Sequence, residues 1–322
     1  MVVRLAPVAL TFAAVVAMPA AAQEYPTKPL RFIAPNLPGG PTDILARLIG
    51  QKLSESMGQP VVIDNRAGAA GNIGTEIAAK APPDGYTLLS GNNATFGANA
   101  SLYKRLGFDP IKDFTPVVLV ATQPNILVVH PSLPVRSVKE LIVLARQKPG
   151  ALNYASSGTG TAAHLAAELF KSMTHTNMVH IAYKSGGPAL TDLIAGQTQL
   201  MFATALSAAP HIKSNRVRPL AVTTDKRSRF YSDLPTIAEA GVPGFEASTW
   251  HGVLVPAGTP APIVQRLNSE INKMLQSADV RERINTLGGE VAGGSSNEFA
   301  DHIQREIPKW AKVVKSIGLQ LD

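Results

Sequence analysis

Short apolar runs rich in β-branched residues recur along the chain and alternate with longer amphipathic stretches. The runs occupy residues 29–35, 60–65, 86–91, 115–122, 125–130, 152–156, 177–183, 198–204, 217–224 and 250–256. Many of them lack the apolar/polar alternation of a strand that has one exposed face. Strands buried on both faces are typical of largely parallel sheets covered by helices. The pattern therefore predicts an α/β protein.

Several amphipathic stretches have helical spacing. Residues 41–57 place their large apolar side chains on one stripe, with Pro41 suited to the first turn and Gly58 to the C-terminal cap. Residues 260–275 and 297–316 have similar stripes, and Pro308 is expected to kink the second of these helices. Capping-box spacing predicts further helix starts at Ser137–Glu140, Thr236–Glu239 and Ser295–Glu298.

The N-terminus has the pattern of a secretory signal peptide. A single cation, Arg4, precedes an apolar run over 5–18 and the small residues Ala20, Ala21 and Ala22. We expect cleavage after residue 22 and export to the periplasm; the alternative is an N-terminal membrane anchor. The chain contains no cysteine, so neither disulfides nor lipid attachment through cysteine is expected.

The remaining 322 − 22 = 300 residues are more naturally two domains than one. No repeat or long linker separates two halves, and the segments near 117–130 and 241–251 resemble strands that cross between lobes. We therefore expect a discontinuous domain, 23–122 plus 247–322, with 123–246 inserted as the second domain.

Charge and motifs exclude several classes of function. Without Arg4 the balance of basic and acidic residues is 29 − 23 = +6, with no block of lysine or arginine, which argues against nucleic-acid binding. This positive charge fits attraction of small anions or simply solubility. The chain has no Gly-x-Ser-x-Gly elbow, no His-Glu-x-x-His motif and no histidine pair at metal-ligand spacing. We expect a protein that is not an enzyme and has no metal or cofactor.

Glycine-rich turns between a strand and a helix are the clearest chemical signals. One turn carries Gly39, Gly40 and Thr42; another carries Ser157, Gly158, Thr159, Gly160 and Thr161. The unpaired amides of a helix N-terminus attract a carboxylate, at about 0.3–1 kcal/mol and up to about 2 kcal/mol when partly buried. Either turn taken alone is equally well explained as a tight turn with a helix cap.

Other polar residues follow strand ends, where ligands of α/β sheets bind. They are Asn92 and Thr95 in a third turn, Thr204 after a strand, and Asp192 in a short helix opened by Gly186 and Gly187. Asp192 and Asp43 either contact a ligand or complement a helix dipole, and Thr204 either contacts a ligand or ends its strand. His164 is expected to cap or pack rather than bind. A dinucleotide-type match at Gly158-x-Gly160-x-x-Ala163 is weak, because the next strand ends in Lys184 instead of an acidic residue.

Several short blocks follow one another along the chain: Tyr25-Pro-Thr-Lys-Pro29, Pro38-Gly-Gly-Pro-Thr-Asp43 with Ala46-Arg47, Gly58-Gln-Pro-Val-Val62, Asn65-Arg66-x-Gly68, Asn72-Ile-Gly74, Pro83-Asp-Gly-Tyr-Thr-Leu-Leu89, Tyr154-Ala-Ser-Ser-Gly158 with His164-Leu165, and Trp250-x-Gly252 with Pro256-Ala-Gly-Thr-Pro260. In these blocks the chain resembles the tripartite tricarboxylate transporter receptors, or Bug-type periplasmic binding proteins. The resemblance covers nearly the whole mature chain.

The resemblance implies a two-lobed, type II Venus-flytrap fold with crossover strands as the hinge. It implies a monomer that captures a small carboxylate and delivers it to a large and a small membrane subunit. In relatives one carboxylate is held by backbone amides and waters at the loops matching Gly39–Gly40 and Ser157–Thr161. Position by position, Thr42, Asn92, Thr95, Asp192 and Thr204 are added.

One residue departs from the family pattern. Before Pro-Gly-Gly the family usually has an aromatic residue, whereas this chain has Asn36 and Leu37. Asn36 replaces an aromatic wall with a hydrogen-bonding amide and is therefore added to the candidate ligand residues. Two alternatives to a transport receptor remain from the residues: a solute sensor for a membrane kinase, and a secreted hydrolase.

Overall fold

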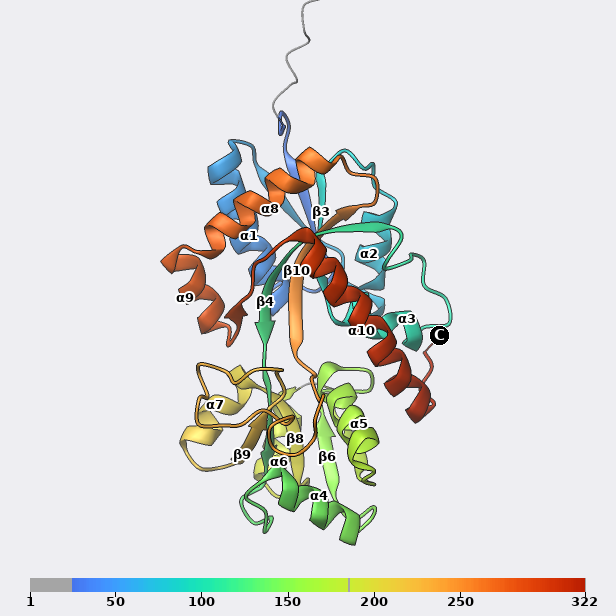
Figure 1. Ribbon diagram of the computed structural model, residues 1–322, viewed down its shortest axis with the longest axis vertical. Coiled ribbons are helices and arrows are strands. Elements are labelled where there is room, and N and C mark those ends of the chain that lie inside the picture. The colour runs from blue at the N-terminus through green and yellow to red at the C-terminus, as the bar shows by residue number, and fades with distance from the viewer. Residues whose placement is uncertain (1–24, 185, 322) are drawn as a thin grey trace, which may run out of the picture.

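The computed structural model describes residues 25–184 and 186–321, so the predicted signal peptide lies outside the described residues. Figure 1 shows two lobes, each built on a β-sheet flanked by helices, one above the other. The long strands β4 (Phe114–Gln123) and β10 (Thr249–Pro256) run between them. The two-lobed α/β prediction is confirmed.

The sheet of the first lobe has the strand order β11-β4-β10-β3-β1-β2. Its remaining strands are β1 (Leu30–Ala34), β2 (Val61–Asn65), β3 (Thr87–Asn92) and β11 (Glu290–Val291). One face packs against α1 (Pro41–Met57), α8 (Ala261–Leu275) and α9 (Ala278–Thr286). The other face packs against α2 (Asn72–Ala79), the π-turn Ala94–Ala98 and α10 (Ser296–Ile317), with the 3-10 turn Ala69–Gly71 and α3 (Asn99–Leu102) nearby.

The sheet of the second lobe has the strand order β7-β6-β8-β5-β9. Its strands are β5 (Asn125–Val129), β6 (Asn153–Ser156), β7 (Val179–Ala182), β8 (Leu200–Thr204) and β9 (Arg218–Val222). One face is covered by α4 (Val138–Gln147) and α5 (Ala162–Thr174), the other by α6 (Gly186–Ile194) and α7 (Ala205–Lys213). The α5 face also receives Trp310, Val313 and Val314 from the end of α10, which therefore joins the two lobes.

Both sheets are mixed, which corrects the expectation of largely parallel sheets. β10 is antiparallel to both of its neighbours, β3 and β4, and β5 is antiparallel to β8 and β9. The reversal follows from connectivity, because the chain enters the second lobe directly from β4 into β5 through Pro124 and returns along β10. An apolar run shows that a strand is buried on both faces and leaves its direction undetermined.

Each apolar run of the sequence forms a strand, and the 41–57 stripe forms α1 with Gly58 as its left-handed cap. The capping boxes at Ser137 and Ser295 begin α4 and α10, and Pro308 lies inside α10; the predicted kink stays a prediction.

The box at Thr236 forms its hydrogen bonds with Glu239 but opens only a turn. Gly241, at φ +114°, and Pro243 end the helical path before a second turn can form.

A second contact between the lobes lies beside β11. Glu290 accepts hydrogen bonds from the Ser228 hydroxyl at 2.6 Å and from the Arg229 amide at 3.2 Å. Leu206, at the start of α7, packs on Gly288, where a Cβ would lie 3.3 Å from the leucine. The lobes are thus in contact on both sides of the two crossing strands. The exact division into domains at 122/123 and 246/247 stays a prediction.

Candidate functional site

The turn between β1 and α1 is held by the buried carboxylate of Asp43, which is 2% exposed. One oxygen accepts the Gly39 amide at 2.9 Å and the Arg47 side chain at 3.0 Å, and the other accepts the Asn65 amide at 2.8 Å. Burial by itself raises the pKa of Asp43, but these hydrogen bonds outweigh it and the pKa lies below its usual value. Asp43 therefore shapes the turn from within it.

This arrangement changes which amides of the first turn can meet a ligand. The Gly39 amide already has an acceptor in Asp43, so it is not a free donor as expected. Among the described residues, the amides of Gly40, Thr42 and Asp43 have no acceptor, because the first amides of an α-helix lack an intrahelical partner. The donors offered at this helix end are therefore those of Gly40, Thr42 and Asp43.

Asn92 and Thr95 shape the third turn. The Asn92 side-chain oxygen accepts the amides of Ala94 at 2.9 Å and Thr95 at 3.2 Å. Its side-chain nitrogen reaches the Asn36 oxygen at 3.5 Å, which brings the two predicted asparagines together. Thr95 is fully buried and its hydroxyl donates to the Asn92 carbonyl, so it supports the turn from behind.

His251, on the crossing strand β10, lies against these turns. It is paired with Asn92 across the sheet, and its Nδ1 lies 3.4 Å from the Thr42 hydroxyl oxygen. Its Nε2 lies 3.3 Å from Oε1 of Gln123, the last residue of β4, and the Gln123 nitrogen donates to the Leu287 carbonyl at 2.8 Å. Because Gln123 Oε1 can only accept, Nε2 of His251 carries the proton and the Thr42 hydroxyl donates to Nδ1.

Burial lowers the pKa of His251 to about 4, so the ring is neutral near pH 7. An unfolded histidine titrates near pH 6.5, so the unfolded chain binds a proton that the folded protein excludes. We expect the free energy of unfolding to fall by about 2 kcal/mol more in the wild type than in His251→Gln between pH 7 and pH 5. Urea unfolding at both pH values measures this difference.

His175→Gln, which changes an exposed histidine, serves as the control and should keep the pH dependence of the wild type. An identical pH dependence in His251→Gln and the wild type would show that His251 is not excluded from protonation by folding.

The loop between β6 and α5 in the second lobe uses part of its own amides. The Gly158 amide donates to the Ser156 hydroxyl at 3.1 Å, and the Gly160 amide donates to His164 Nδ1 at 3.0 Å. The Thr161 hydroxyl turns back to the Gly158 carbonyl at 2.7 Å and does not cap α5. Within the described chain, the amides of Ser157 and Thr159 and those of the first turn of α5 have no acceptor.

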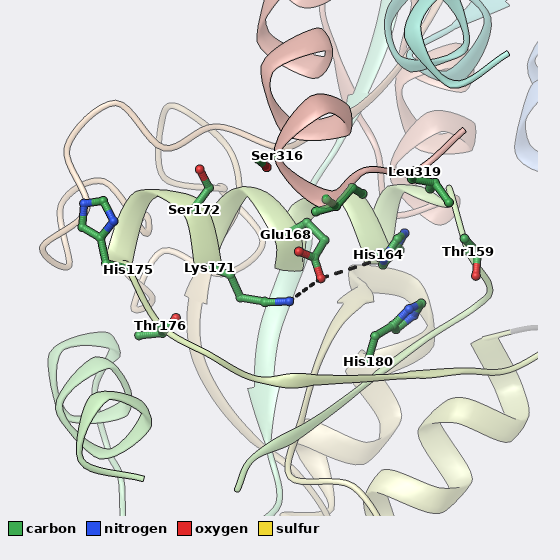
Figure 2. Close-up of a pocket in the computed structure, with 11 residues that line it drawn as sticks. Thr159, His164, Glu168, Lys171, Ser172, His175, Thr176, His180, Ser316 and Leu319 are labelled. Atoms are coloured by element: carbon green, nitrogen blue, oxygen red, sulfur yellow. Dashed lines mark hydrogen bonds and ion pairs between the residues drawn. The ribbon is translucent and has the colours of Figure 1, made fainter. Parts of the chain in front are cut away.

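His164 packs and caps, in agreement with the prediction. Its ring stacks on His180 of β7 with centroids 4.0 Å apart, and burial lowers its pKa to about 4. Figure 2 shows His164, Glu168 and Lys171 along one side of α5, with His180 opposite. These residues line a cavity of about 650 Å³ between α5 and the end of α10, and Thr159 lies at its edge.

Asp192 and Thr204 have partners of their own. The Asp192 carboxylate accepts the Tyr183 hydroxyl at 2.7 Å; burial first, then this bond, raises the pKa of Tyr183 to about 12. Thr204 is exposed, and its hydroxyl accepts the Ser207 amide as the N-cap of α7. Both residues lie near the β6–α5 loop. Tyr183, the partner of Asp192, has its carbonyl 3.2 Å from the Cβ position of Gly158. Thr204 ends β8, which pairs with β6.

The candidate residues thus form one group on each lobe, both at the carboxyl ends of strands. The sequence profile of the "Tripartite tricarboxylate transporter family receptor" matches residues 45–319. The chain belongs to this family. The receptor is 38% identical, over 95% of its own length and 94% of the relative's, to Protein BugT of Bordetella pertussis (strain Tohama I).

Two solved structures are similar to the receptor over most of its length. R. palustris Rpa4515 with adipate has 43% sequence identity and a TM-score of 0.76, covering 92% of this chain and 99% of that chain. MatC (Rpa3494) from Rhodopseudomonas palustris with bound malate has 33% identity and a TM-score of 0.72, covering 90% and 100%. The receptor is therefore a solute-binding protein of the periplasmic binding-protein type.

In residues 25–184 and 186–321, no helix has the length and apolar content of a membrane span. In the same part of the chain, no group of three histidine, aspartate or glutamate side chains is placed to hold a metal ion.

Sequence reasoning missed His251 and Gln123 of the receptor. Both sit on crossing strands beside the predicted turns, and their contact to each other spans 128 positions in the sequence. The only signal was their place in segments already interpreted as crossing strands, with His251 inside the Trp250-x-Gly252 block.

Proposed function

We propose that the receptor captures a small dicarboxylate between its lobes and delivers it to the membrane components of a tripartite tricarboxylate-type transporter. The observation that carries this proposal is the pair of helix N-termini, at α1 and α5, whose first amides have no acceptor among the described residues. Each follows the carboxyl end of a strand, β1 or β6. A carboxylate is the ligand that such ends favour.

Uncharged hydrogen-bond donors near both helix ends suit an anion. Asn36, Asn92 and the free amides of the second loop are uncharged donors, and Arg47 is already paired with Asp43. Closure of the lobes excludes water and strengthens such dipolar contacts. Two helix ends, one on each lobe, can each hold one carboxylate group. The adipate and malate bound by two similar receptors are both dicarboxylates and support this class.

A thermal-shift screen of the mature protein tests the ligand class. We expect a dicarboxylate such as adipate or malate to raise the melting temperature by several degrees, since ligand at 100 times Kd adds about 2.7 kcal/mol. Adipamide, which has the same shape without charge, is the matched control and should give no shift. Shifts with neutral or cationic solutes alone would contradict the proposal.

Delivery to a transporter needs a separate experiment. Uptake of the labelled solute is measured in cells that contain the membrane components, with and without the receptor. Receptor-dependent uptake supports delivery, whereas binding without any effect on uptake would contradict it and favour a sensor.

A further inference from the structure

Asn125 is a buried residue whose side-chain amide is not used by the protein. It is the first residue of β5, reached from β4 through Pro124, and it is 2% exposed. Its backbone is satisfied: the amide donates to the Thr223 hydroxyl at 3.0 Å, and the carbonyl accepts the Thr223 amide at 2.9 Å. Its side-chain Nδ2, in contrast, is fully buried and has no hydrogen-bond partner among the described residues.

A buried N–H without an acceptor destabilises the protein that carries it. A leucine at this position would have a similar volume and no polar group to satisfy. The stability of the fold therefore does not explain an asparagine at this position. An acceptor supplied from outside the chain would explain it.

The position of Asn125 indicates where that acceptor comes from. Asn125 pairs with Thr204 at the carboxyl end of β8, and β8 pairs on its other side with β6, which leads into the α5 loop. Side chains two apart on a strand share a face. Leu127 and Val129 of β5 pack in the same core as Leu165 of α5, so Asn125 lies on the face of the sheet that α5 covers.

We propose that Asn125 is a specificity-determining residue, whose side-chain amide donates a hydrogen bond to an oxygen of the second carboxylate group of the bound ligand. This inference rests on the proposed function. Nδ2 is closed to solvent in the present arrangement of the lobes. Asn125 lies where β4 becomes β5, so the proposal requires that a rotation of the lobes about this segment uncovers the amide toward the ligand.

The decisive variant is Asn125→Leu, which removes the donor at similar volume. We expect the melting temperature of the free protein to stay equal or rise, because an unsatisfied group is removed. The Kd for adipate should increase at least tenfold, while the Kd for hexanoate, which lacks the second carboxylate, should not change. Asn125→Asp places a like charge beside that carboxylate and should weaken adipate more than leucine does.

Thr198→Val is the matched control. The Thr198 hydroxyl is likewise buried, at 1% exposure, and has no hydrogen-bond partner among the described residues, but Thr198 precedes β8 at the end opposite Thr204. Its loss should likewise leave the melting temperature equal or higher, and it should leave the Kd for adipate unchanged.

Two results would overturn the inference. One is a melting temperature that falls by several degrees in Asn125→Leu, which would mean that the amide serves the fold. The other is an unchanged ratio of the Kd values for adipate and hexanoate. Both results require a wild type that binds adipate, so they overturn the inference alone. A wild type that binds no dicarboxylate overturns the proposed function and, with it, this inference.

Discussion

Replacement of Gly160 by proline is expected to weaken carboxylate binding by about 100-fold or more, equal to about 2.8 kcal/mol, while the protein stays folded. Gly160 has φ +79°, which the fixed ring of proline cannot adopt. Proline also removes the amide that donates to His164 Nδ1. The loop must then change course immediately before α5, and the free amides of Ser157, Thr159 and the first turn of α5 lose their common orientation. Calorimetric titration with the carboxylate found by the screen gives the Kd.

Gly58→Pro is the control for this substitution. Gly58 has φ +70°, has no atom within 4 Å of its Cβ position, and donates its amide to Ser54. The same two features are therefore lost, but at the end of α1 opposite the predicted site. We expect a lower melting temperature with an unchanged Kd. An unchanged Kd in folded Gly160→Pro would exclude the α5 loop from ligand binding.

The α1 loop, like the α5 loop, has a backbone amide that donates to a side chain four residues later. Asp43 already accepts the Gly39 amide, so the loop shape depends on a contact four residues away in the sequence. That contact is local and could have been predicted, because a carboxylate in the first turn is the usual partner of an unpaired N-terminal amide. From the sequence, Asp43 has two possible roles and the Gly39 amide is predicted to be a free donor; the structure pairs the two groups.

Local signals predicted ten of the strands and several of the helices, because these elements depend on neighbouring residues. The apolar runs, the stripe of α1, and the capping residues Ser137 and Ser295 all act within a few positions. The helix predicted to start at Thr236 does not form, and this also has a local cause, because Gly241 and Pro243 follow within two helical turns.

The arrangement at the crossing strands could not be read in this way. Whether His251 meets Thr42, and whether Asn125 is left without an acceptor, depends on the register of β10 and β5 with strands that are distant in the sequence. A one-residue shift would turn each side chain to the other face of its sheet. Candidate ligand residues on loops were therefore predictable, whereas those on the crossing strands were not.

The buried carboxylate of Glu306 depends on the same kind of distant contact. It is 3% exposed on α10, and its Oε2 accepts the indole N–H of Trp250 at 3.1 Å and that of Trp310 at 2.9 Å. Its Oε1 pairs with Lys309, which also pairs with Glu246 at 2.5 Å. Burial by itself lowers the pKa of Lys309, but the two carboxylates outweigh it and raise the pKa above its usual value.

Glu306→Leu is accordingly expected to lower the free energy of unfolding by about 3–5 kcal/mol, measured by urea denaturation. Two buried indole N–H groups lose their acceptor and Lys309 loses one of its two counter-charges. Glu55→Leu is the matched control, because Glu55 also pairs with a lysine three residues away but is exposed; its effect should stay below about 1 kcal/mol. Replacing Lys309 together with Glu306 should cost less than the sum of the two single changes, since each single change leaves a charge unpaired. A loss below about 1 kcal/mol in Glu306→Leu would mean that the tryptophans find other acceptors, and that this carboxylate does not hold β10 to α10.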